Sequence, residues 1–88
     1  MPGPRITVTD AFEGRGGVFV MPRFTASGPV REPFAIHLRA PDGTLRTARA
    51  TIDAAHLRGA GGSFAMYRVL DVPLADLVVG TEIWPLEG

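Results

Sequence analysis

The 88-residue chain contains no cysteine, lysine, asparagine or glutamine. Without cysteine it can form no disulfide, no thiolate nucleophile and no cysteine metal cluster. Without lysine it can form no Schiff base and no phosphate-binding loop of the G-x-x-x-x-G-K-[ST] type. No apolar run approaches the roughly 20 residues of a membrane-spanning helix, and no apolar segment follows the first five residues as in a signal peptide. We therefore expect no membrane association and a cytoplasmic location.

The charges balance, because nine arginines offset nine acidic residues. This balance gives no general attraction to nucleic acid, a membrane surface or an acidic partner. Arginine as the only strongly basic residue type fits GC-rich coding and suggests a bacterial source. With 45% hydrophobic and 20% charged residues, the composition is typical of a folded protein, and the length fits a single domain over residues 1–88.

Short stretches rich in β-branched and aromatic residues alternate with glycine and proline. Residues 14–17 (GRGG) and 41–44 (PDGT) are typical of tight turns. Residues 53–57 fit either a short helical turn or a continued strand, and residues 73–80 fit a short helical turn that ends at glycine. The predicted strands are residues 5–12, 18–25, 33–39, 45–52, 63–70 and 81–86. This pattern predicts an all-β fold, a small closed six-stranded antiparallel β-barrel.

Alternation within these strands predicts which side chains form the core, since every second residue of a strand faces the same side. The residues that we expect in the core are Ile6, Val8, Phe12, Val18, Val20, Phe34, Ile36, Leu38, Ile52, Phe64, Met66, Leu77 and Ile83.

Three segments together resemble a known family. DAF followed by GRGGVFV, the later AGGSFAMYRVLDV, and the closing VPLADLVVGTEIWP occur in the order and at the spacing found in the second domain of translational GTPases such as elongation factor Tu. The resemblance covers residues 6–85 and implies a translation-factor type of β-barrel. Residues 21–23 (MPR) and 31–33 (REP) depart from the family pattern, so no functional contact is transferred to them. The chain itself lacks a GTPase domain and is not expected to bind GTP.

In that family the domain packs against the GTPase domain and helps to contact tRNA or the ribosome. The resemblance therefore implies a non-enzymatic binding module without a cofactor, which we expect to bind a protein partner. The GRGG segment lies between two predicted strands and does not precede a helix. A hairpin turn is therefore favoured over a phosphate cradle or an RNA-binding arginine-glycine segment.

RNA binding is the main alternative, because several basic residues flank the turn at residues 41–44. Arginine can neutralise phosphates, and Tyr67 or Phe19 nearby could stack on bases. Trp84 either closes one end of the barrel or serves as an exposed anchor. The candidate residues for RNA or partner binding are His37, Arg39, Arg46, Arg49 and Trp84.

A third hypothesis is a hydrolase that uses His56 with Asp53, three residues earlier. A metal site is not expected, because His37, His56 and Asp53 supply too few ligands without cysteine. Ser63 follows two glycines but lacks the G-x-S-x-G pattern of a nucleophile elbow. The sequence therefore favours a binding module over an enzyme.

Overall fold

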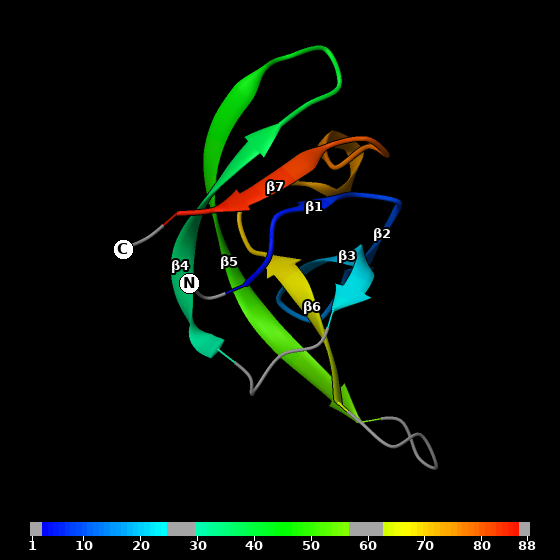
Figure 1. Cartoon of the computed structure of the whole chain (residues 1–88), viewed down its shortest axis with the longest axis vertical. Helices are drawn as coiled ribbons and strands as arrows, with labels where there is room; N and C mark the ends of the chain where they lie inside the picture. Colours follow the sequence, from blue (N-terminus) through cyan, green and yellow to red (C-terminus); the bar gives the residue numbers. More distant parts are fainter. Residues whose placement is uncertain (1–2, 25–29, 57–62, 87–88) are drawn as a thin grey trace.

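A computed structural model describes residues 3–24, 30–56 and 63–86, with the backbone alone at 30–31, 54–56 and 63–64. These residues form an antiparallel sheet and a 3₁₀ turn (Figure 1). In chain order the elements are β1 (Ile6–Thr7), β2 (Asp10–Gly14), β3 (Gly17–Phe24), β4 (Val30–Arg39), β5 (Leu45–His56), β6 (Ser63–Val69), η1 (Leu74–Asp76) and β7 (Glu82–Pro85). No helix in this part of the chain is long and apolar enough to cross a membrane.

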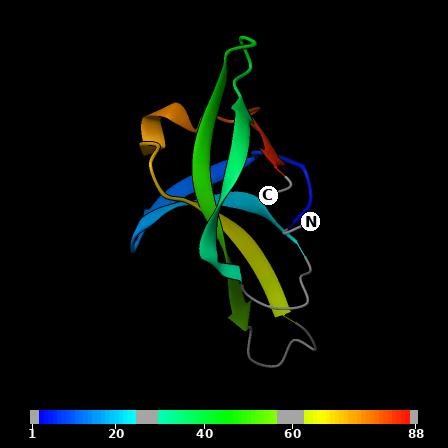
Figure 2. The same ribbon diagram turned by 90° about the vertical axis from the view of Figure 1, so that its left-hand side faces the viewer.

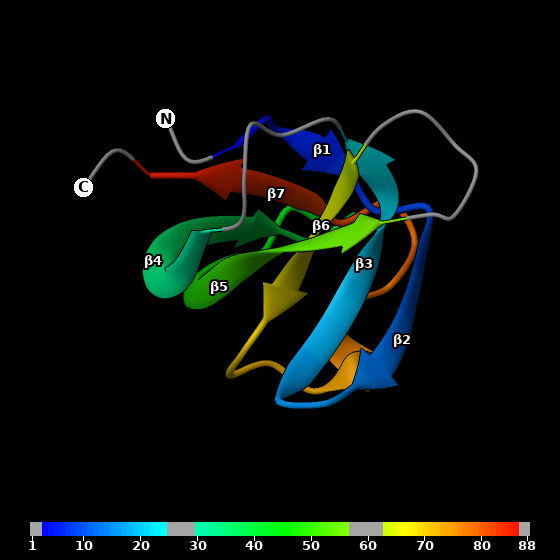
Figure 3. The same cartoon turned by 90° about the horizontal axis from the view of Figure 1, so that it is seen from below.

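The seven strands lie in the order β1-β7-β4-β5-β6-β3-β2. Figure 3 shows β2, β3 and β6 running steeply across the direction of β1, β7 and β4, so the sheet is strongly curled. Strands β4 and β5 form a long twisted hairpin that extends along the molecule (Figure 2). The prediction of an all-β antiparallel fold is confirmed. The closed six-stranded barrel was wrong, because the sheet is a seven-stranded half-barrel.

The additional strand arises where the predicted strand 5–12 bends at Val8 and Thr9. The Val8 amide donates to the Thr81 carbonyl at 2.7 Å, and the Val8 carbonyl accepts from Gly80 at 2.8 Å. The next amide, that of Thr9, donates to the Met21 carbonyl at 2.9 Å. The chain therefore leaves β7 and joins β3 within two residues, which divides one expected strand into β1 and β2 at opposite ends of the sheet order.

The tight turns lie where the sequence predicts them. Arg15 and Gly16 connect β2 to β3, and Gly16 has a φ of +80° that favours glycine. In the β4–β5 turn, Asp42 Oδ1 accepts the Thr44 amide at 2.9 Å. Residues 53–56 continue β5 as a strand, so the helical-turn option is wrong. The η1 turn begins after Pro73 as expected, but it ends at Asp76 and not at the glycine. Gly80, with a φ of +98°, lies in a separate turn in which the Thr81 amide donates to the Val78 carbonyl at 3.1 Å. Residues 60–62 (AGG), which separate the predicted strands 45–52 and 63–70 in the sequence, lie outside the described residues.

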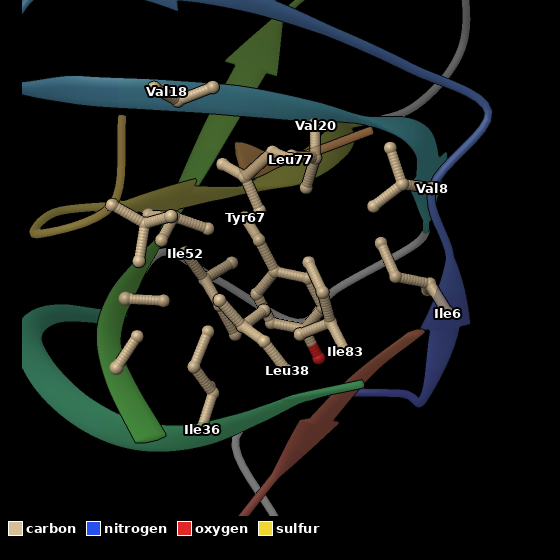
Figure 4. Packing of buried hydrophobic residues seen from close by; sticks show 14 of the residues in the cluster. Ile6, Val8, Val18, Val20, Ile36, Leu38, Ile52, Tyr67, Leu77 and Ile83 are labelled. Carbon is tan, nitrogen blue, oxygen red and sulfur yellow. The ribbon is translucent and has the colours of Figure 1, made fainter. Parts of the chain in front are cut away.

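The core lies on the concave side of the half-barrel (Figure 4). Of the expected core residues, those confirmed as buried are Ile6, Val8, Val18, Val20, Ile36, Leu38, Ile52, Leu77 and Ile83. The sequence did not predict the other buried apolar residues, which are Ala48, Ala50, Ala65, Tyr67, Val69 and Val72.

Two expected core residues face the other way. Phe12 is 44% exposed, because the bend at Val8 and Thr9 shifts the alternation and lets Ala11 pack against the core instead. Met66 is half-buried on the outer face of β6, because its neighbour Tyr67 points inward. Phe34 is only partly buried against the core, so truncating it to alanine should cost less than the roughly 3–5 kcal/mol of a fully buried ring. The side chain of Phe64 lies outside the described part of the structure.

Tyr67 is the largest fully buried side chain. On β6 it pairs with Val20 of β3 on one side and with Ile52 of β5 on the other. Its ring lies 4.9 Å from that of Phe24 and 6.2 Å from that of Phe34, measured between centroids. Its hydroxyl donates a hydrogen bond to the Pro4 carbonyl. Tyr67 thus connects three strands and the segment before β1, and the suggestion that it stacks on RNA is wrong.

Burial raises the pKa of Tyr67, since desolvation disfavours the phenolate. Unfolded tyrosine ionises near pH 10, so above that pH the unfolded chain loses a proton that the folded chain keeps. We expect the free energy of unfolding to fall by about 1.4 kcal/mol per pH unit above about pH 10, with no contribution below it. The chain has no lysine or cysteine and one tyrosine, so near-ultraviolet tyrosinate absorbance reports this residue alone.

The matched control is Tyr67→Phe, which should lose this alkaline slope. Tyrosinate absorbance that rises near pH 10 while the wild-type protein is still folded would contradict the burial of Tyr67.

Candidate functional site

Four of the five predicted site residues share the outer, convex face of the sheet. His37 of β4 pairs with Trp84 of β7, and Arg39 lies two residues along the same strand. Arg49 of β5 pairs with Ala35, which keeps it on that face. We call these residues, together with Arg5, the arginine–tryptophan face.

Arg5 belongs to this face because β1 pairs with β7. Its guanidinium carbon lies 4.3 Å from the centroid of the Trp84 ring, a cation–π contact. Trp84 is half-buried, and its Nε1 is enclosed with no hydrogen-bond partner among residues 3–24, 30–56 and 63–86. Trp84 is therefore neither a fully exposed anchor nor part of the inward core.

The charges on this face are only partly neutralised. Arg49 Nε lies 3.6 Å from Asp71 Oδ2, and both side chains are exposed. Arg39 pairs across the sheet with Glu82, yet within the described ranges no carboxylate lies within 4.0 Å of Arg39 or Arg5. The face combines an aromatic surface with arginines that remain free to contact an anion.

Arg46, the fifth candidate residue, does not lie on this face. It pairs with the buried Leu38, and it lies two residues from the buried Ala48 in the same strand, so it is on the concave side of the sheet. At the end of the hairpin its Nη1 lies 3.1 Å from Oδ2 of Asp76, next to η1. The spacing could have shown this, since Arg46 and Arg49 are three residues apart in one strand and so face opposite sides.

A second surface lies on the outer face of β2 and β3, and the sequence analysis missed it. Phe12 and Phe19 pair across the hairpin, with ring centroids 5.6 Å apart and an angle of 19° between the rings. Phe12 is 44% exposed. Met21 and Met66 are half-buried. Each lies two residues from an outward-facing residue of its own strand, Phe19 on β3 and Arg68 on β6, and therefore faces the same side. We call Phe12, Phe19, Met21 and Met66 the aromatic–methionine face.

Two residues hold this face in shape. A Cβ atom on Gly14 would lie 2.3 Å from the Phe19 ring, so this glycine leaves the space that the ring occupies. Arg68, the cross-strand neighbour of Phe19, donates from Nη1 to the Arg15 carbonyl at 2.9 Å and from Nε to Thr51 Oγ1 at 3.1 Å. Arg68 thereby fastens the β2–β3 turn to β5 and β6. The GRGG segment is a turn that also shapes a surface.

The hairpin contained the signal for this surface. With a turn at Arg15 and Gly16, Phe12 and Phe19 are equidistant from the turn and must pair on one face. Because Val18 and Val20 point inward, both phenylalanines must point outward.

The free edge of β2 is protected. β2 is the last strand in the sheet order, and the Ala11 amide donates to Oδ1 of its neighbour Asp10 at 2.9 Å instead of to another strand. Glu13 adds a charge to the same short edge strand. Such features oppose the addition of another strand, so contact at this end of the sheet would use side chains of the outer face.

The residues of the hydrolase hypothesis are only partly described. Asp53 accepts the Thr51 hydroxyl at 2.9 Å, and its Oδ1 lies 3.4 Å from Arg68 Nε. The side chains of His56 and Ser63 lie outside the described residues, so this hypothesis stays untested. No group of three or more histidine, aspartate and glutamate side chains placed to hold a metal occurs among the residues that the structure describes.

No protein-family model, curated protein or solved structure matches the chain.

Proposed function

We propose that the domain is a non-enzymatic module that binds a protein partner through the aromatic–methionine face. The observation that carries this proposal is the stacked pair of Phe12 and Phe19, with Phe12 44% exposed on the convex face. Rigid aromatic rings supply contact area at low entropic cost, and methionine adapts to a partner's shape. Aromatic residues and methionine are the types enriched at protein interfaces.

The surroundings of the face support a protein partner over a nucleic acid. Arg68, its central basic residue, is already committed to Thr51, Arg15 and Asp53. Asp10 and Glu13 on β2 add negative charge nearby, and the net charge of the chain is zero. A partner protein with an apolar patch requires no positive field, whereas a phosphate backbone does.

The proposed activity agrees with the resemblance to the second domain of translational GTPases, whose barrel acts by packing on other components. The described parts of the quoted motifs lie in the β2–β3 hairpin, in β6 and in the segment from η1 to β7. We propose that the chain is a translation-factor-like module that acts beside a separately encoded partner.

Phe12→Thr tests the proposal, with Leu45→Thr as the matched control. Leu45 is 64% exposed on the other half of the sheet. Both changes therefore replace one exposed apolar side chain by threonine, a residue that is common in strands. We expect the wild type and the Leu45→Thr control to retain a partner protein from cell lysate, and Phe12→Thr to lose it. The purified partner should bind Phe12→Thr at least tenfold more weakly than it binds the wild type.

A cross-strand aromatic pair stabilises a hairpin by up to about 1 kcal/mol, so the unfolding free energies of both variants are measured alongside. Equal binding of the partner by the folded Phe12→Thr variant would contradict the proposal.

RNA binding through the arginine–tryptophan face is a second candidate function. The specific observation is the gathering of Arg5, Trp84, His37 and Arg39 on one face, with Arg5 already positioned on the indole ring. Arginine and aromatic side chains together bind single-stranded RNA by neutralising phosphates and stacking on bases.

Arg39→Ala and Arg46→Ala form a matched pair for this candidate, because they remove one arginine each from opposite faces of the same hairpin. If the face binds single-stranded RNA, Arg39→Ala should lower the slope of log affinity against log salt by about 0.7. Arg46→Ala should leave the slope unchanged. A wild-type dissociation constant weaker than about 100 μM at physiological salt would exclude this function.

A further inference from the structure

A pocket of about 280 Å³ opens at one end of the half-barrel. It lies between the end of the β4–β5 hairpin and the segment that runs from η1 to β7. The lining residues that matter here are Leu38, Asp42, Arg46, Asp76, Val78 and Thr81. Mouths of small barrels are common ligand sites when apolar walls surround a few polar groups.

The pocket carries a net charge of −1, because Asp42 and Asp76 outweigh Arg46. Hydrogen bonds from Thr44 hold the pKa of Asp42 below its usual value, so its carboxylate stays ionised at neutral pH. Asp76 gives only Oδ2 to Arg46, at 3.1 Å, which leaves its second oxygen able to accept another donor. This charge favours a cationic occupant.

Thr81 provides the independent sign of a ligand. Its residue is 1% exposed, and its Oγ1 has no hydrogen-bond partner in the described part of the chain. Its backbone is fixed, because its carbonyl accepts from Val8. A buried hydroxyl without a partner is costly unless something else bonds to it, and this residue lines the pocket.

The apolar surroundings indicate a larger partner than a free amine. Leu38 is part of the pocket wall, while Val78 at its edge and the adjacent Val79 are 47% and 67% exposed. A protein that inserts one side chain into the pocket could also cover these two valines with the apolar surface around that side chain. The chain has no lysine of its own.

We propose that this pocket receives the lysine side chain of a partner protein, whose neighbouring apolar surface packs on Val78 and Val79. The inference rests on the proposed function, since it names the chemistry of that partner. The ammonium group would donate to Asp42, Asp76 and Thr81, and the aliphatic stem would lie along Leu38. A lysine fits better than an arginine, because a planar guanidinium seeks both oxygens of one carboxylate and Arg46 already holds one.

The test is an NMR titration of the amide signals with N-acetyl-lysine-methylamide, using the norleucine analogue as the uncharged control. A single side chain of this size should bind with a dissociation constant of about 1–10 mM. We expect the shifts to map to residues 38–46 and 75–81, and the norleucine compound to produce none there.

Asp76→Asn and Asp71→Asn are the matched variants, because each removes one carboxylate from an exposed arginine pair and only Asp76 lines the pocket. Asp76→Asn should weaken the lysine compound at least fivefold, and Asp71→Asn should leave it unchanged. Thr81→Val should remain folded and also weaken binding. Equal weakening by both aspartate variants, or no shifts at the pocket in the wild type, would overturn the inference.

Further arms separate this inference from the proposed function. Phe12→Thr should bind the lysine compound as the wild type does. A protein that captures a partner through Phe12 but ignores the lysine compound would overturn the lysine inference alone. If n-butylammonium binds but N-acetyl-lysine-methylamide does not, the pocket is a site for a free amine, and the proposal that it receives a partner's lysine is overturned.

Discussion

The fold depends on the burial of Tyr67 at the centre of the curled sheet. Its ring lies between the strands that carry Val20 and Ile52, and its hydroxyl bonds to the Pro4 carbonyl ahead of β1. One side chain therefore fixes the register of β6 and ties the start of the chain to the middle of the sheet. A slip of β6 by one residue would expose this ring and bury Arg68.

The same register creates the outer surfaces. With Tyr67 inward, Arg68 must point outward, where it reaches the β2–β3 turn and supports Phe19. On the other half of the sheet, inward Ile36 and Ile83 place His37 and Trp84 outward. Core packing thus separates an apolar aromatic–methionine face from a basic arginine–tryptophan face, and the two proposed binding functions differ in which face they use.

The sequence predicts much of the local structure, because turns and alternation are local properties. The hairpins at residues 15–16 and 41–44 and nine core positions follow from it. The direction of Tyr67 does not, since β6 carries apolar residues on both faces, with Met66 on one and Tyr67 on the other, and pairing with distant strands decides between them. The bend at Val8 and Thr9, which reverses Phe12, depends on partners in β7 and β3. The pocket around Thr81 likewise joins segments far apart in the chain.

In this structure Tyr67 faces the core while Phe12 faces solvent. Paramagnetic relaxation of the aromatic ring protons by a soluble, uncharged gadolinium complex measures this directly, because only exposed rings approach the probe. We expect strong relaxation of the Phe12 ring and almost none of the ring of Tyr67, the only tyrosine in the chain. Strong relaxation of Tyr67 together with a protected Phe12 would contradict the register on which both the fold and the proposed binding face depend.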